Sequence, residues 1–299
     1  MSGTTDLENY KNCKEYKDFI KFKERFTYYF NIYNIAFTEK IILDFYIFTQ
    51  RLLTENAKYN LTSITGTDDI IVKHYIDSVI ALKYFNMPEN ASVIDIGSGA
   101  GFPSVPLRIM RGDLNITFLD GSEKKINFIK SALNKISESD YKNYKNCADY
   151  SSGENIFYRG RAEDAGKDLK LRGKYGYAVS RAVAKLNVLC ELAAPMLKQG
   201  GYFIAYKGRN AAEEITEAQN ALNLLGLNIE ETKEFNIYVS QKINKRNKAK
   251  EIKEIKDNGN GVEEKEEEDN KRTLIKIKKI NKTSAEYPRN FSNITKNPL

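Results

Sequence analysis

The chain has 299 residues, a formal net charge of +7 and 41% hydrophobic residues, enough length and apolar content to bury one full-sized core. The charge fits either a polyanionic partner or an ordinary solvated basic surface. The polar N-terminus and the lack of any run of about 18 apolar residues exclude a signal peptide or membrane span, so we expect a cytoplasmic protein without a membrane partner. Three widely spaced cysteines predict neither a metal site nor a disulfide framework.

The first part of the chain predicts helices. Residues 14 to 33 and 39 to 55 carry apolar side chains at helical spacing, and a third helical stretch runs from about 68 to 85, just before Pro88. Residues 1 to 87 are therefore expected to form an N-terminal helical cap ahead of the main fold.

From residue 91 the pattern changes to short apolar runs separated by amphipathic segments, which is typical of a doubly wound, Rossmann-like α/β sheet. No helix fits between the last two expected strands, so these should form an antiparallel hairpin. We expect a main domain over residues 88 to 280 and a basic C-terminal tail over 281 to 299. The seven expected strands are 92 to 96, 115 to 120, 155 to 159, 175 to 180, 201 to 206, 233 to 239 and 272 to 279.

Two stretches interrupt this alternation. Residues 139 to 154 are polar and rich in Tyr, Asn and Ser, and they predict a mobile loop. Residues 241 to 271 carry basic residues followed by acidic ones with almost nothing apolar, which predicts a disordered insertion. A charged hairpin that contacts RNA stays open as an alternative for the second stretch.

The sequence VIDIGSGAGFP, residues 93 to 103, predicts a buried strand followed by a glycine turn. The glycines Gly97, Gly99 and Gly101 are spaced GxGxG, whereas sites that seat a pyrophosphate use GxGxxG. S-adenosylmethionine has no phosphate, and its amino-acid head needs both hydrogen-bond acceptors and donors. The turn therefore favours this cofactor, with Asp95 near the head group. An ordinary strand-to-helix turn is the alternative.

Further candidates for cofactor binding follow the second and third strands. Asp120 closes the second strand, where a carboxylate can accept hydrogen bonds from both ribose hydroxyls, and Gly121 and Ser122 leave room for the adenosine. Ala162 and Glu163 follow the third strand, where they can contact the adenine edge. Acidic residues in such turns are also often helix caps, and this second interpretation stays open.

Three basic side chains are candidates for positioning a substrate. Arg181 ends the fourth strand and can bind the cofactor carboxylate or a substrate phosphate, or form a surface ion pair. Lys207 ends the fifth strand at the same edge. His74, the only histidine, shares a helix face with Asp77 and Ser78, which allows either a general base or a structural histidine.

Several sequence blocks coincide in order and together resemble the bacterial ribosomal RNA small subunit methyltransferase G family, also called glucose-inhibited division protein B. The resemblance covers about residues 40 to 290 apart from the two interruptions. The tail departs from it, because it keeps YPR and a final KNPL but lacks a middle containing proline and glycine. The blocks are YNLTSI (59 to 64), KHYIDS (73 to 78), DIGSGAGFPSVPL (95 to 107), FLDGSEKKINFI (118 to 129), RAE (161 to 163), SRAVAKL (180 to 186), YKG (206 to 208), RTLIKIKK (272 to 279) and YPR (287 to 289).

The resemblance implies a seven-stranded class I methyltransferase that uses S-adenosylmethionine to methylate N7 of one guanine in 16S ribosomal RNA, position 527 in the 530 loop. It also implies 16S RNA, the 30S subunit or its precursor as the partner, and we expect a monomer. No catalytic residue is assigned; His74, Arg181 and Lys207 remain candidates for positioning the substrate. Cofactor contacts carried over by the matching motifs are Gly97, Phe102, Asp120 to Ser122, Ala162, Glu163 and Arg181.

The chemistry agrees with these residue types. Guanine N7 carries a lone pair and can attack the sulfonium methyl without first losing a proton, so no strong base is needed. A 5-methylcytosine enzyme would need a nucleophilic cysteine, and neither Cys147, in a polar stretch, nor Cys190, within a helix, is well placed. Methylation of another RNA base or of a small molecule stays open, as does a ribosome-associated module that binds the cofactor without catalysis. A NAD-dependent oxidoreductase is disfavoured by the glycine spacing.

Overall fold

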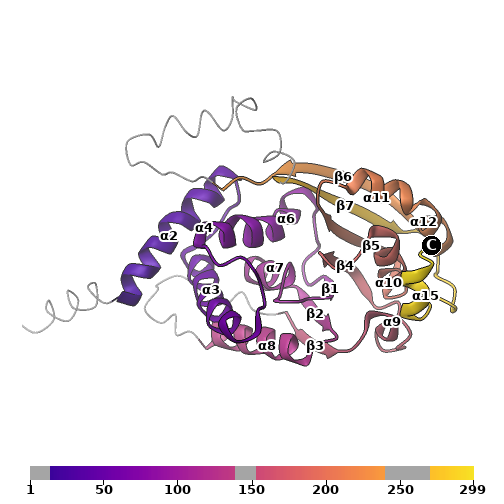
Figure 1. The fold of residues 1–299 in the computed structure, drawn as a ribbon, viewed down its shortest axis with the longest axis horizontal. Helices are drawn as coiled ribbons and strands as arrows, with labels where there is room; N and C mark the ends of the chain where they lie inside the picture. Colours follow the sequence, from indigo (N-terminus) through magenta and orange to yellow (C-terminus); the bar gives the residue numbers. More distant parts are fainter. Residues whose placement is uncertain (1–13, 139–152, 240–269) are drawn as a thin grey trace, which may run out of the picture.

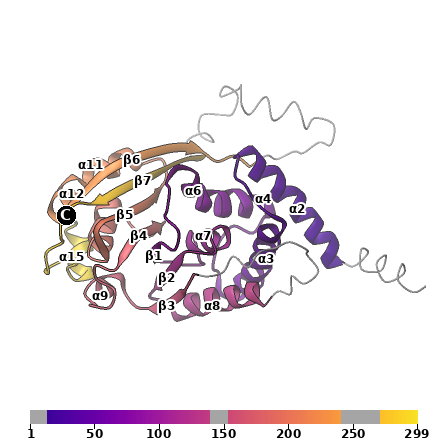
Figure 2. The same cartoon turned by 180° about the vertical axis from the view of Figure 1, so that it is seen from behind.

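The computed structural model describes residues 14–138, 153–239 and 270–299. Nearly all of the two interrupting stretches, which we predicted to be a mobile loop and a disordered insertion, lies outside the described residues. Figure 1 shows a central sheet with helices on both of its faces, and Figure 2 shows the same arrangement from behind.

The sheet has seven strands in the order β3-β2-β1-β4-β5-β7-β6. The first five strands are parallel, and β7 runs antiparallel to both of its neighbours. This confirms the doubly wound sheet and the antiparallel pairing of the last two strands. The strands are β1 (Ser92–Ile96), β2 (Asn115–Asp120), β3 (Asn155–Arg159), β4 (Tyr175–Arg181), β5 (Leu197–Lys207), β6 (Leu227–Asn236) and β7 (Lys271–Lys279).

The predicted bounds of β6, 233 to 239, were wrong, because the strand begins at Leu227. Gly226, with φ +65°, ends the preceding helix, and the strand follows directly. β6 is an edge strand that pairs only with β7, and its exposed side chains are mostly polar or charged. Charged side chains on an edge discourage pairing with other chains. They also mask the apolar alternation by which strands are recognised in sequence.

Side chains of alternating strand positions enter two different hydrophobic clusters, as expected for a sheet covered on both faces. In β1, Val93 belongs to one cluster, whereas Ile94 and Ile96 belong to the other. The helices that contribute residues to the first cluster are α2 (Lys14–Ile32), α3 (Glu39–Tyr59), η1 (Ile70–Ile76), α5 (Asp77–Val79), α6 (Ala81–Tyr84), α7 (Ser104–Met110) and α8 (Glu123–Ser137), while the short polar α4 (Thr67–Asp69) precedes η1. Those associated with the second are α9 (Ala162–Ala165), α10 (Leu186–Ala193), α11 (Ala211–Glu217), α12 (Gln219–Leu225) and α15 (Phe291–Lys296).

The N-terminal helices share a core with the sheet. Phe48 of α3 is fully buried, and its ring lies 5.6 Å from that of Phe102, after β1, and 6.2 Å from that of Phe128 in α8. The helical extension is thus confirmed, while the domain boundary at residue 87 stays a prediction. Among the described residues, no helix is both long and apolar enough to span a membrane.

The third predicted helix, 68 to 85, is divided into four segments. Its central part, η1, is a π-helix: the backbone N–H of Asp77 reaches back to the carbonyl of Val72, five residues earlier. Wider turns of this kind are frequent at functional sites. Here the wider turn lies directly above the end of β4, so that His74 and Asp77 both contact Arg181.

Candidate functional site

Two cavities open at the carboxyl ends of the parallel strands, the edge at which α/β sheets bind their ligands. The first cavity has a volume of about 640 Å³ and the second about 520 Å³. Val183, which follows β4, lines both of them, so they are neighbours. The first cavity is lined by Gly97, Asp120, Gly121, Ser122, Ala162 and Glu163 among others, and the second by His74, Asp77, Arg181, Lys207 and Arg272 among others.

The glycine turn forms part of the first cavity through Gly97. All three glycines have positive φ values, +74° at Gly97, +57° at Gly99 and +90° at Gly101, which side chains rarely allow. A Cβ on Gly97 would lie 2.5 Å from Val183 Cγ2, and one on Gly101 would lie 2.5 Å from Val105 Cγ2. Gly99 and Gly101 do not line the cavity. Gly99 and Gly101 shape the turn, whereas Gly97 allows the turn to approach Val183, which lies between the two cavities.

The Asp120 carboxylate is fixed by the backbone around it. Oδ2 accepts a hydrogen bond from the Gly99 N–H at 3.0 Å, and Oδ1 accepts one from the Ser122 N–H at 2.8 Å. A carboxylate has about four lone-pair positions, so each oxygen can still accept a further hydrogen bond. Asp120 thus joins the turns after β1 and β2 and presents a fixed acceptor to the first cavity.

The turn after β3 forms another wall of the first cavity. Ala162 and Glu163 both line it, and Glu163 is buried. The N-cap of α9 is Arg161, whose side chain makes no capping hydrogen bond. Glu163 is therefore not a helix cap, and the capping alternative fails for this residue.

Asp95 lies behind the glycine turn and lines neither cavity. Its carboxylate is fully buried, and neither oxygen has a hydrogen-bond partner. Burial raises the pKa of Asp95 to about 7, an effect that the positive charge of Arg181 partly opposes. Its side chain shares a sheet face with Val93, because strand positions alternate, so it projects beneath the turn and toward α7.

Phe102, expected at the cofactor, instead supports residues of the second cavity. Its ring stacks on the His74 ring with centroids 4.3 Å apart, and the guanidinium carbon of Arg181 lies 5.0 Å from its centroid. The aromatic face stabilises the cation and confines both side chains. Phe102 itself is buried and lines neither cavity.

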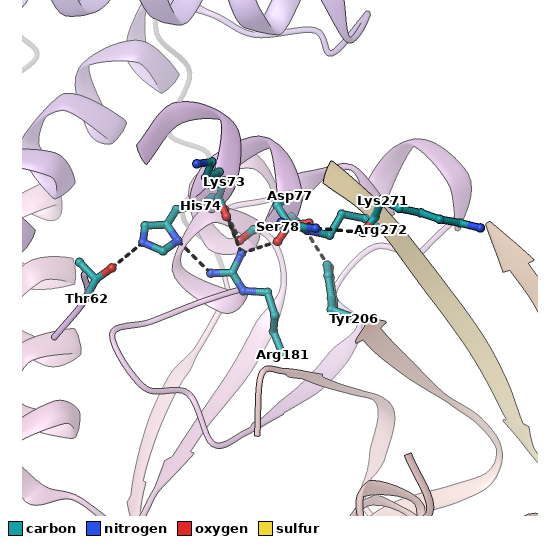
Figure 3. A network of polar contacts seen from close by, with 9 residues as sticks. All are labelled: Thr62, Lys73, His74, Asp77, Ser78, Arg181, Tyr206, Lys271 and Arg272. Atoms are coloured by element: carbon teal, nitrogen blue, oxygen red, sulfur yellow. Dashed lines mark hydrogen bonds and ion pairs between the residues drawn. The ribbon is translucent and has the colours of Figure 1, made fainter. Parts of the chain in front are cut away.

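Arg181 is the centre of a polar network, shown in Figure 3. Its Nη1 donates to Asp77 Oδ2 at 2.9 Å and to the His74 carbonyl at 3.4 Å. Arg272 from β7 forms a longer ion pair with Asp77, 3.7 Å between Nε and Oδ1. The side chains of Arg181 and Asp77 are only 13% and 10% exposed, so the alternative of a surface pair is wrong. The structure places Arg181 in the second cavity, not the first.

The same network fixes the proton of His74. Arg181 Nη2 lies 3.3 Å from Nδ1, and Nε2 lies 2.9 Å from the Thr62 hydroxyl. A guanidinium can only donate, so Nδ1 accepts and Nε2 carries the proton. Burial, together with the charge of Arg181, lowers the pKa of His74 to about 3. With its only lone pair engaged, His74 is a poor general base and positions Arg181 instead.

Lys207 lines the second cavity. Its Nζ is 2.6 Å from Glu214 Oε2 and donates to the Ala184 carbonyl at 2.7 Å. The Lys207 side chain is 7% exposed and that of Glu214 is 20% exposed, so the cation is buried and its partner is partly buried.

A cysteine nucleophile is absent from the described part of the site. Cys190 is fully buried within α10, and burial raises its thiol pKa to about 12. A thiol of that kind is not ionised at neutral pH. Cys13 and Cys147 lie outside the described residues.

Four residues of the site were missed by the sequence interpretation or given no role in it: Asp77, Val183, Arg272 and Phe291. Asp77 had a detectable signal, because it follows His74 by three positions and Arg181 needs a counter-charge. Val183 lies within the quoted block SRAVAKL, but nothing in the sequence shows that it separates two cavities. Phe291 lines the first cavity from the C-terminal tail, and no sequence pattern indicates this.

Comparison with known proteins gives a consistent result. The family model described as rRNA small subunit methyltransferase G matches residues 41–244. A ribosomal RNA small subunit methyltransferase G from Clostridium beijerinckii is 38% identical over 250 residues, covering 83% of this chain and 87% of the relative. One from Clostridium botulinum is 37% identical over 269 residues, covering 90% and 95%.

Solved structures resemble the chain more distantly. Pyrococcus horikoshii TYW2, in complex with MeSAdo, has a TM-score of 0.43 at 13% identity and covers 69% of this chain and 62% of that one. A precorrin-6y C5,15-methyltransferase from Geobacter metallireducens has a TM-score of 0.42 at 15% identity, covering 68% and 87%.

Proposed function

Because the chain belongs to the ribosomal RNA small subunit methyltransferase G family, we propose that it transfers a methyl group from S-adenosylmethionine to guanine N7 at position 527 of 16S ribosomal RNA. One observation carries this proposal: two cavities of nucleoside size meet at Val183. One is built from a glycine turn and a fixed carboxylate, the other from cations. Cofactor and target base then lie side by side at one strand edge.

The first cavity fits the cofactor. Its volume of about 640 Å³ lies in the range of small-molecule sites. Asp120 would hold the ribose hydroxyls, Gly97 would lie against the methionine part, and Ala162 and Glu163 would contact the adenine. When bound, S-adenosylmethionine supplies a methyl group on a positively charged sulfur, which a lone pair can attack directly.

The second cavity would receive the guanine nucleotide. Arg181 and Lys207 offer donors for a phosphate or a base edge, while Asp77 and Glu214 keep these cations in place. His74 holds Arg181 from the other side. N7 needs no proton removed, so these residues act by positioning. The neutral His74 and the protonated Cys190 thiol agree with chemistry that uses neither a base nor a nucleophile.

The substrate particle and the oligomeric state belong to the same proposal. We propose that the chain acts as a monomer in the cytoplasm on 16S RNA, either as free RNA or within a 30S subunit or its precursor. The two cavities lie within one chain, so no second copy is needed to complete the site.

The test uses 30S subunits from cells that lack the modification, the purified chain and cofactor carrying a labelled methyl group. We expect one methyl group per subunit, located by chemical cleavage at 7-methylguanine followed by primer extension to position 527. Naked 16S RNA and 50S subunits are the controls. Methylation at a different base, or tight cofactor binding without transfer to any ribosomal particle, would refute the proposal.

A further inference from the structure

Phe291 of the C-terminal tail is a large apolar side chain that belongs to neither hydrophobic cluster. It is 42% exposed and lines the first cavity together with Ala162, Glu163 and Leu192. An aromatic ring that is partly exposed beside a ligand cavity can stack on a ligand bound there.

One neighbour places this ring at a particular end of the cavity. The guanidinium carbon of Arg161 lies 5.2 Å from the Phe291 centroid. Arg161 directly precedes Ala162 and Glu163, the residues proposed above to contact adenine. Phe291 therefore lies at the proposed adenine end of the first cavity. It is far from Ala162 and Glu163 along the chain but close to them in space.

The tail that carries Phe291 is firmly held before it. Arg289 donates to Glu191 of α10 through its backbone N at 2.8 Å, its Nε at 2.9 Å and its Nη2 at 2.7 Å. Glu191 is fully buried, so this anchor lies inside the molecule. Arg172 adds a hydrogen bond of 2.7 Å to the Tyr287 carbonyl.

The tail is also held after Phe291. Ile294, three residues later in α15, is fully buried in the second hydrophobic cluster. The Asn290 side chain caps α15 by accepting from the Asn293 N–H at 2.9 Å. With an anchor on each side, the ring is ordered before any ligand arrives, so binding does not have to order the tail.

We propose that Phe291 is a cofactor-binding residue that stacks against the adenine of S-adenosylmethionine, while Arg161, which also lines the first cavity, contacts the same ring. This inference rests on the proposed function, because it takes the first cavity as the cofactor site. The C-terminal tail then contributes directly to cofactor affinity and is more than a structural appendage.

The test is isothermal titration of the full chain with S-adenosylhomocysteine and with adenosine. Loss of a stacked aromatic ring predicts that Phe291→Ala weakens both ligands roughly tenfold. Phe291→Tyr keeps the ring and should bind within about twofold of wild type. Ser292→Ala is the matched control, since Ser292 is an exposed neighbour in the same helix that does not line the cavity.

Thermal unfolding of each variant checks the fold, and Phe291→Leu provides a second variant with smaller volume loss if the alanine variant is unstable. A steady-state assay distinguishes cofactor binding from the chemical step: the KM for S-adenosylmethionine should rise in Phe291→Ala, while kcat stays near the wild-type value. Unchanged affinity of a folded Phe291→Ala, or a loss confined to the affinity for 30S subunits, overturns this inference alone. Wild-type protein that binds neither ligand overturns the proposed function itself.

Discussion

The two cavities are built by different means. The first depends on the path of the backbone: positive φ values at the glycine turn, and an Asp120 carboxylate held by two peptide N–H groups. The second depends on long side chains, with Arg181 held by the buried Asp77 and Lys207 by the partly buried Glu214. We infer that changes in the first cavity act on the turn and the cofactor together. Changes in the second should alter substrate positioning and leave the cofactor in place.

The largest effect is expected for Gly97→Val. The new Cβ would lie 2.5 Å from Val183 Cγ2, on a backbone with φ +74° that a β-branched residue resists. Cofactor affinity, measured by isothermal titration, should fall by about 100-fold or more.

Gly173→Val is the matched control for this change. Gly173 also has positive φ, +68°, but nothing lies within 4 Å of its Cβ position and it lines neither cavity. It should lower stability by a similar strain, about 1–3 kcal/mol, and keep its affinity for the cofactor. Equal loss of affinity in both variants would mean that strain alone, not the turn at the cavity, controls binding.

The second-largest effect is expected for Arg181→Met, which distinguishes the roles of the two cavities. Removing the cation should slow methylation of 30S subunits roughly 30-fold and leave cofactor affinity within about threefold, because Arg181 does not line the first cavity. The free energy of unfolding should fall by about 2–3 kcal/mol. This is less than for a buried acid left with no counter-charge, because Asp77 keeps its ion pair with Arg272 at 3.7 Å. A parallel fall in cofactor affinity would instead assign Arg181 to the cofactor.

His74→Gln tests the network through pH. The pKa of His74 is depressed to about 3 in the folded chain, below its unfolded value, so the unfolded chain takes up the proton first. The contribution of neutral His74 is fully present above about pH 6.5 and is lost as pH falls, by about 2 kcal/mol between pH 7 and pH 4.5. Urea unfolding should show that His74→Gln loses correspondingly less stability over this range. Parallel curves would show that His74 titrates normally.

The smallest effect is expected at the rim of the first cavity. Arg159 lines it and pairs with Glu123 at 3.0 Å, but these side chains are 63% and 60% exposed. Arg159→Ala should change unfolding free energy by less than about 0.5 kcal/mol and cofactor affinity by less than about twofold. A tenfold loss of cofactor affinity would show that a rim side chain, and not only the backbone, determines binding in this cavity.

The sequence was sufficient for features that depend on local patterns. The parallel strands alternate with amphipathic segments, and the glycine turn after β1 needs residues that tolerate positive φ. These signals identified several residues that line the first cavity, including Gly97, Asp120 and Ala162.

Other features arise only from contacts between distant segments. Asp95 and Phe102 lie beside the glycine turn in sequence, but strand alternation and packing direct them beneath it or toward His74. The π-helix that contains His74 faces Arg181, which lies 107 residues away in the chain. The anchor of the tail joins residues 98 apart, Glu191 and Arg289, and periodicity carries no information about such pairs.

The last two strands offer a position for protein engineering. Asn236 and Lys271 form their terminal pair, extended by the hydrogen bond from Ile237 N–H to the Asn270 carbonyl, so the chain leaves and re-enters the sheet at one point. Loop-closure entropy grows only slowly with length, so an affinity tag or a fluorophore-bearing domain inserted there should be tolerated. Phe235 and Arg272 line the second cavity beside this point. If the second cavity receives the substrate, as proposed above, a reporter placed there should respond when 30S subunits bind.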